Sequence, residues 1–116
     1  MMWYRAGSAH EMPGKTGVAH CLEHMLFKGT SRLRQGQIDR ITQRHGGVNN
    51  AFTWLDATAY VFNFSSSGWR VALDIEAERM RGSLLDAKEF ALEKAVILEE
   101  RSIEMDAPEG MLLEEV

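Results

Sequence analysis

The chain has 116 residues, with 13 Lys or Arg, 17 Asp or Glu and 4 His, and a formal net charge of −4 at pH 7. This length allows one domain, and the negative charge argues against nucleic-acid binding, which usually needs a basic surface. The single cysteine excludes an intrachain disulfide and a zinc site built from several cysteines, and no apolar run approaches the roughly 18 residues that a membrane span needs.

The first third of the chain predicts a strand followed by a helix. Residues 1–6 are predicted to form a short strand. Apolar residues recur at helical spacing over residues 17–27, which predicts a helix. Thr16 is its expected N-cap and Gly29 its expected stop.

In the middle of the chain the sequence pattern changes from one typical of a helix to one typical of strands. A second helix is predicted over residues 35–45, because two glycines follow it. Residues 48–54 and 58–64 are rich in β-branched and aromatic side chains and are separated by three residues. This pattern predicts a β-hairpin. Ser67 is the expected N-cap of the next helix.

Two further helices are predicted over residues 69–81 and 88–105, with an interruption near Gly82. Pro108 is expected to close the last one. The order of elements predicts an α+β fold, in which helices pack on one face of an antiparallel sheet.

Charge is distributed unevenly along the sequence. Residues 1–60 hold 7 basic and 4 acidic groups (7 − 4 = +3), whereas residues 61–116 hold 6 basic and 13 acidic groups (6 − 13 = −7). Solvated helix faces explain the acidic half most simply. An acidic surface that suits a basic peptide is the alternative.

The strongest motif is His-x-x-Glu-His, formed by His20, Glu23 and His24. Residues four apart on a helix project from the same side, so both imidazoles can reach one metal ion. Zinc accepts neutral imidazole nitrogen, and Glu23 stands beside the same site, suited to take a proton from water. At this composition the pattern is expected by chance only about 0.014 times, and its order is that of the inverzincins.

A catalytic zinc requires a third protein ligand. His10 and His45 are candidates at loop-like positions, although His45 is better explained as the C-terminal residue of its helix, where the helix dipole favours it. Carboxylates of the last predicted helix are better candidates: Glu93, Glu99, Glu100 and Glu104. Glu93 and Glu100 lie only about 20° apart around a helix, whereas Glu99 points about 100° away from Glu100. This acidic stripe faces either the interior or the solvent.

Several segments together resemble the pitrilysin and mitochondrial-processing-peptidase family of zinc metallopeptidases. Residues 14–30 are similar to the family's zinc helix, and residues 46–53 to its Gly-Gly-x-x-Asn-Ala-x-Thr segment. Residues 3–8 resemble its first strand, and residues 93–100 its distal glutamate motif. The resemblance covers essentially the whole chain and is strongest to the shorter bacterial and mitochondrial-type members.

The resemblance implies one Zn²⁺ per chain and a role for each of seven residues. These are the zinc ligands His20, His24 and Glu100, the general base Glu23, the orienting glutamate Glu93, and Asn50 and Ala51, which lie where the family binds the substrate main chain. The implied function is a zinc-dependent metalloendopeptidase. The alternative is a non-catalytic subunit that binds peptides or scaffolds a peptidase complex.

The family's proteins are considerably longer than this chain. We therefore expect residues 1–116 to be a single, incomplete N-terminal zinc-binding peptidase domain. Its expected partners are a peptide or protein substrate and a missing C-terminal domain or partner subunit of the same family, with no nucleic acid and no membrane span. The style of the match suggests the bacterial periplasm as its compartment.

Overall fold

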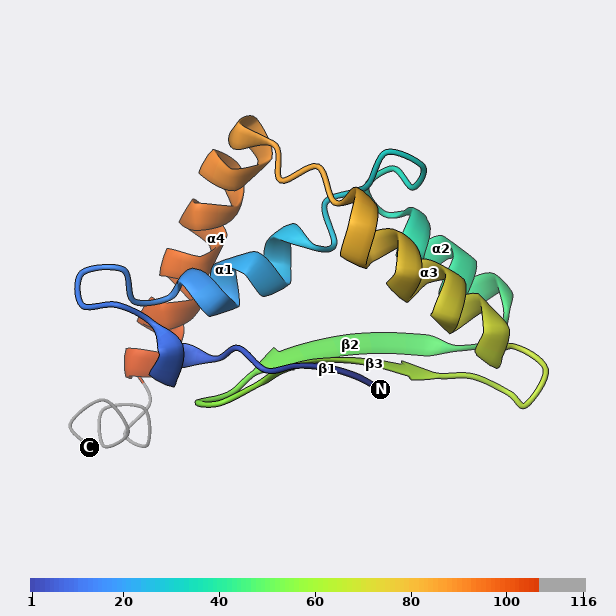
Figure 1. Ribbon diagram of the computed structural model, residues 1–116. Coiled ribbons are helices and arrows are strands. Elements are labelled where there is room, and N and C mark those ends of the chain that lie inside the picture. The colour runs from blue at the N-terminus through green and yellow to red at the C-terminus, as the bar shows by residue number, and fades with distance from the viewer. Residues whose placement is uncertain (107–116) are drawn as a thin grey trace. The chain divides into compact units, whose positions relative to one another are not determined.

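The chain forms two compact units, Met1–Leu85 and Asp86–Val116. The structure is a computed structural model that describes residues 1–106 (Figure 1). The first unit contains three strands, one 3₁₀ helix and three α-helices: β1 (Met2–Tyr4), η1 (Ser8–His10), α1 (Val18–Met25), α2 (Gln37–Arg44), β2 (Val48–Thr53), β3 (Thr58–Asn63) and α3 (Trp69–Gly82). The described part of the second unit is α4 (Ala87–Asp106).

The three strands form one antiparallel sheet in the order β1-β3-β2. β2 and β3 form the predicted hairpin, in which Thr53 lies directly opposite Thr58. The Trp54 N–H donates to the Ala57 carbonyl at 2.8 Å and closes the turn. β1 pairs with the other side of β3, so β2 is an edge strand.

Helices of the first unit cover one face of this sheet (Figure 1). The apolar core between the layers consists of a few buried side chains: Met25, Ile38, Tyr60 and Ile75. On the opposite face Trp3 and Phe52 are exposed and pack edge to face, with ring centroids 5.6 Å apart. The predicted α+β fold, with helices on one face of an antiparallel sheet, is confirmed.

The start of α1 differs from the prediction. Thr16 is not the N-cap; Gly17 occupies that position with φ of +89°, a left-handed conformation that glycine adopts without a Cβ clash. The capping group is the carboxylate of Glu11, which accepts the Gly17 N–H at 2.8 Å and the Ala19 N–H at 2.7 Å. A carboxylate also suits the positive end of the helix dipole.

The end of α1 is shorter than predicted. The helix ends at Met25, and the next residues continue in tighter turns, with Phe27 N–H donating to the His24 carbonyl at 3.0 Å. Gly29 then turns the chain with φ of +124°. It is thus the predicted stop signal, placed after a short 3₁₀-like extension.

The later helices agree with the predicted positions but not with every predicted cap. Ser67 is not the N-cap of α3; that position is Gly68, and the Ser67 hydroxyl lies 3.0 Å from that of Ser65. Asp86 caps α4, because its carboxylate accepts the N–H groups of the second and third residues after it. The predicted closure at Pro108 lies outside the described residues. None of the helices within residues 1–106 has the length and apolar character that crossing a membrane requires.

Candidate functional site

His20 and His24 lie one turn apart on α1, with their imidazole Nε2 atoms 3.0 Å from each other. The ring centroids are 4.5 Å apart, and the ring planes are nearly perpendicular, at 87°. Two nitrogens bound to one tetrahedral zinc at 2.0–2.1 Å would be about 3.3–3.4 Å apart. The donor set and its convergence therefore fit zinc, with an adjustment of only a few tenths of an ångström.

Glu23 belongs to the face of α1 that packs on the sheet. Its side chain is only 8% exposed, whereas His20 and His24 are half-buried. The helix therefore presents its imidazoles and its carboxylate in different directions, about 60–100° apart around the axis.

Two groups from the sheet hold this part of α1. The Thr53 hydroxyl donates to Glu23 Oε2 at 2.5 Å, and the Tyr60 hydroxyl lies 3.5 Å from the Glu23 carbonyl oxygen. Burial raises the pKa of Tyr60 well above its ordinary value, so this phenol stays protonated and remains a donor. Both contacts join α1 to neighbouring strands of one sheet.

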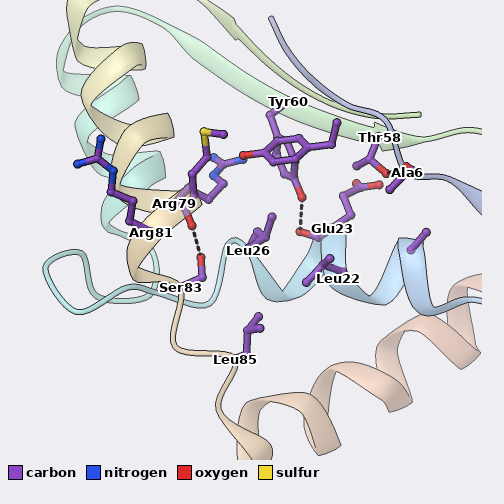
Figure 2. Close-up of a pocket in the computed structure, with 13 residues that line it drawn as sticks. Ala6, Leu22, Glu23, Leu26, Thr58, Tyr60, Arg79, Arg81, Ser83 and Leu85 are labelled. Atoms are coloured by element: carbon purple, nitrogen blue, oxygen red, sulfur yellow. Dashed lines mark hydrogen bonds between the residues drawn. The ribbon is translucent and has the colours of Figure 1, made fainter. Parts of the chain in front are cut away.

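A cavity of about 290 Å³ lies beside Glu23, between α1, the sheet and α3. Figure 2 shows Glu23 rising from α1 toward the strand that carries Thr58, and Tyr60 extending over the same space. Most of its lining is apolar, including Leu22 and Leu26. The general base predicted from the sequence thus borders an apolar cavity.

Arg79, which also lines this cavity, forms a buried ion pair with Glu76. Neither residue was predicted from the sequence. The guanidinium of Arg79 lies over the rings of Tyr60 and Phe27, 4.2 and 4.6 Å from their centroids. Its Nη1 is 3.7 Å from Glu76 Oε1, too far for a hydrogen bond. The only available signal was the Glu-x-x-Arg spacing, which places both residues one turn apart on α3.

This pair is incompletely satisfied. Among the described residues, neither the guanidinium nitrogens of Arg79, nor the carboxylate oxygens of Glu76, nor the hydroxyl of Tyr4 has a hydrogen-bond partner. Burial raises the pKa of Glu76 and lowers that of Arg79, and the attraction between the two charges opposes both shifts. The desolvation free energy of the two charges is therefore larger than the stabilisation from their mutual attraction.

Asn50 and Ala51 lie on β2, the edge strand. Asn50 is exposed, Ala51 is half-buried, and the Ala51 N–H donates to Asn50 Oδ1 at 2.9 Å. An extended peptide can add to such an edge through main-chain hydrogen bonds. The Ala51 N–H becomes available to it only if the Asn50 side chain rotates away.

The two alternative histidines contact their own local backbone. His10 Nδ1 accepts the Gly7 N–H at 3.3 Å. His45 is the C-cap of α2, as its position before two glycines indicated, and its Nδ1 lies 2.9 Å from the Ile41 carbonyl. Both are exposed.

The acidic stripe of α4 is graded in exposure. Glu93 is buried, Glu100 is half-buried, and Glu99 and Glu104 are exposed. The stripe is therefore neither buried throughout nor exposed throughout. Since α4 belongs to the second unit, the roles of Glu93 and Glu100 stay predictions.

Comparison with known proteins gives concordant matches. The family model described as Insulinase (Peptidase family M16) matches residues 1–116. The zinc protease PqqE of Helicobacter pylori is 43% identical over 110 residues, covering 94% of this chain and 25% of that protein. The uncharacterized zinc protease YmxG of Bacillus subtilis is 38% identical, covering 96% and 27%. A probable mitochondrial-processing peptidase subunit beta of Arabidopsis thaliana is 35% identical, covering 85% and 19%.

A solved structure supports the same relationship. The crystal structure of a protease from Helicobacter pylori matches with a TM-score of 0.91 and 42% identity, over 95% of this chain and 27% of that one. The chain thus spans about a quarter of the length of the bacterial relatives it matches.

Proposed function

This chain belongs to the insulinase family, peptidase family M16, and we propose that it supplies the metal-binding and proton-transfer groups of a zinc-dependent metalloendopeptidase. The observation that carries the proposal is the convergence of the His20 and His24 Nε2 atoms at 3.0 Å on the helix that also bears Glu23. The names of the zinc protease relatives support it.

His20 and His24 would hold the zinc through Nε2, which requires both rings to be neutral with their proton on Nδ1. The chemistry that zinc supplies when bound is polarisation of a carbonyl and a lowered pKa of water. Glu23 would accept a proton from the attacking water and deliver it to the leaving amine.

Glu100 would be the third ligand, and Glu93 would orient the site. This part of the proposal rests on the resemblance of residues 93–100 to the distal glutamate motif of the family. Carboxylate groups behind metal ligands commonly fix their orientation. Asn50 and Ala51 would pair with the main chain of a peptide substrate, since they lie on an edge strand.

A non-catalytic subunit is the second candidate function. It is favoured by one observation: some relatives of this chain are named as subunits of a mitochondrial-processing peptidase. The presence of Glu23, His20 and His24 together favours the catalytic role, because a scaffold has no need of the proton acceptor.

Metal content and peptide cleavage should be measured on the complete protein that carries these residues. We expect about one zinc per chain and cleavage in the wild type, no zinc in His20→Ala, and retained zinc without cleavage in Glu23→Gln. Glu99→Gln, which changes an exposed carboxylate, is the matched control and should behave as the wild type. Cleavage at the wild-type rate by Glu23→Gln would falsify the mechanism.

A further inference from the structure

We propose that Thr53 is a positioning residue, whose hydroxyl fixes the orientation of the Glu23 carboxylate. The inference rests on the proposed function, in which Glu23 moves the proton. The direct observation is the hydrogen bond from Thr53 Oγ1 to Glu23 Oε2 at 2.5 Å. It joins residues 30 positions apart, from β2 to α1.

The neighbouring hydroxyl of Thr58 leaves Glu23 as the acceptor for the Thr53 proton. Each threonine hydroxyl has one proton to donate. Thr58, directly opposite Thr53 in the hairpin, donates its proton to the Ala6 carbonyl at 2.9 Å. The two threonine oxygens are 3.3 Å apart. With the Thr58 proton directed to Ala6, the strongest acceptor for Thr53 is the charged oxygen of Glu23, since hydrogen bonds to ionised groups are stronger.

The position of Thr53 on the sheet makes the contact a rigid one. Thr53 is the last residue of β2 and is held by pairing with β3. A β-branched side chain has few χ1 choices, so strand pairing also sets the direction of the hydroxyl. A freely rotating carboxylate would spend part of its time turned away from the attacking water. Fixing one oxygen removes that rotation before substrate arrives.

Stabilising a buried carboxylate is the alternative role for this bond. Glu23 is 8% exposed, and an unbonded polar group at such a site costs free energy. A purely structural hydrogen bond would lower stability when removed but would leave the turnover of the folded enzyme unchanged. Removal of a positioning hydrogen bond would instead lower kcat and leave zinc content and KM unchanged.

The test compares Thr53→Val, Thr53→Ser and Thr42→Val in the complete, zinc-loaded protein. Thr42 is the matched control, because it is a fully buried threonine whose hydroxyl donates to the Ile38 carbonyl at 2.8 Å on another helix. Zinc content, kcat and KM are measured for each. The ¹³C resonance of the Glu23 carboxyl carbon, assigned by its loss in Glu23→Gln, reports the hydrogen bond without any need for activity.

We expect Thr53→Val to lower kcat by about 10- to 100-fold, as is typical when a supporting hydrogen bond is removed. KM and zinc content should stay unchanged, and the Glu23 resonance should shift. Thr53→Ser should restore both kcat and the resonance, and Thr42→Val should alter neither. Thr53→Ala repeats the test if the valine variant does not fold.

A Thr53→Val protein with wild-type kcat, or with an unshifted Glu23 resonance, would overturn the inference. Failure of the proposed function has a different signature: the wild type would not cleave peptides, or Glu23→Gln would. In that case the carboxyl resonance still decides whether Thr53 orients Glu23.

Discussion

Glu11 holds Gly17 from six residues away, through a 2.8 Å hydrogen bond from the glycine N–H to Oε2, and its other oxygen accepts the Ala19 N–H. The first turn of α1 is thus organised by a side chain of the preceding loop. His20 follows directly after Ala19. We therefore expect the stability of this cap to affect the geometry of His20 and His24, the proposed zinc ligands.

Glu11→Ala should destabilise the protein by about 0.5–2 kcal/mol, the usual cost of losing an N-cap. It should also weaken zinc binding, because the turn that carries His20 loses its anchor. Chemical denaturation and competition with a zinc chelator measure the two effects. Gln37→Ala, which removes the side-chain acceptor of the Arg34 N–H at the start of α2, is the control, because that helix carries no proposed zinc ligand. Unchanged zinc affinity in Glu11→Ala would disprove the connection.

Glu100→Gln should reduce zinc content strongly, because an amide is a poorer zinc ligand than a carboxylate. Glu99→Gln should retain zinc at about one ion per chain, since Glu99 is exposed and projects about 100° away. Mass spectrometry of the two purified variants gives the comparison. Equal loss in both, or in neither, would mean that Glu100 is not the third ligand.

Arg79→Met should destabilise the first unit by about 3–5 kcal/mol, because it leaves the carboxylate of Glu76 buried without a counter-charge. The double variant Arg79→Met/Glu76→Leu should regain most of this loss, since apolar side chains can replace a poorly bonded buried pair. Urea unfolding of the single and double variants measures the difference. A double variant as unstable as the single one would contradict this account.

The pH dependence of stability should show the raised pKa of Glu76, which comes from burial. The folded protein holds the proton on Glu76 more tightly than the unfolded chain, whose pKa is near the ordinary value of 4.5. The free energy of unfolding should therefore fall as pH rises from below that value through the raised pKa. Unfolding curves at several pH values should show this fall in the wild type and its reduction in Glu76→Gln; identical slopes would refute it.

Gly7→Ala should be much more damaging than Gly14→Ala. A Cβ at Gly7 would lie 2.2 Å from the Trp54 carbonyl oxygen and 2.7 Å from the Ala57 nitrogen, both backbone atoms that cannot move aside. Gly14 has open space around it, and an alanine there incurs only the cost of its positive φ, about 1–2 kcal/mol. Melting temperatures of the two variants test the ranking, and a smaller loss for Gly7→Ala would show that the turn can relax.

Local patterns predicted the elements, because each depends on residues close in sequence. The helical spacing up to Met25 and the β-branched and aromatic residues of 58–64 needed no knowledge of the fold. The His20 and His24 pair was predictable for the same reason: residues four apart on a helix always share a side.

Contacts over longer separations were not predictable. The prediction of Thr16 as an N-cap was wrong, because the capping carboxylate belongs to Glu11, in a loop whose path the sequence does not specify. The bond from Thr53 to Glu23 depends on how a helix lies on a sheet. An arginine on a helix is usually exposed to solvent, and the burial of Arg79 against the rings of Tyr60 and Phe27 depends on how its helix packs on residues distant in sequence.

The bond between Asn50 and the Ala51 N–H has a consequence for solubility. An edge strand with open backbone donors is a template for aggregation with other chains. At Ala51 the donor is already occupied by a side chain of the same strand, so a stray strand must displace that amide before it can pair. The same competition sets a threshold for any peptide that pairs there, because it must bring enough further contacts to outweigh one intramolecular hydrogen bond.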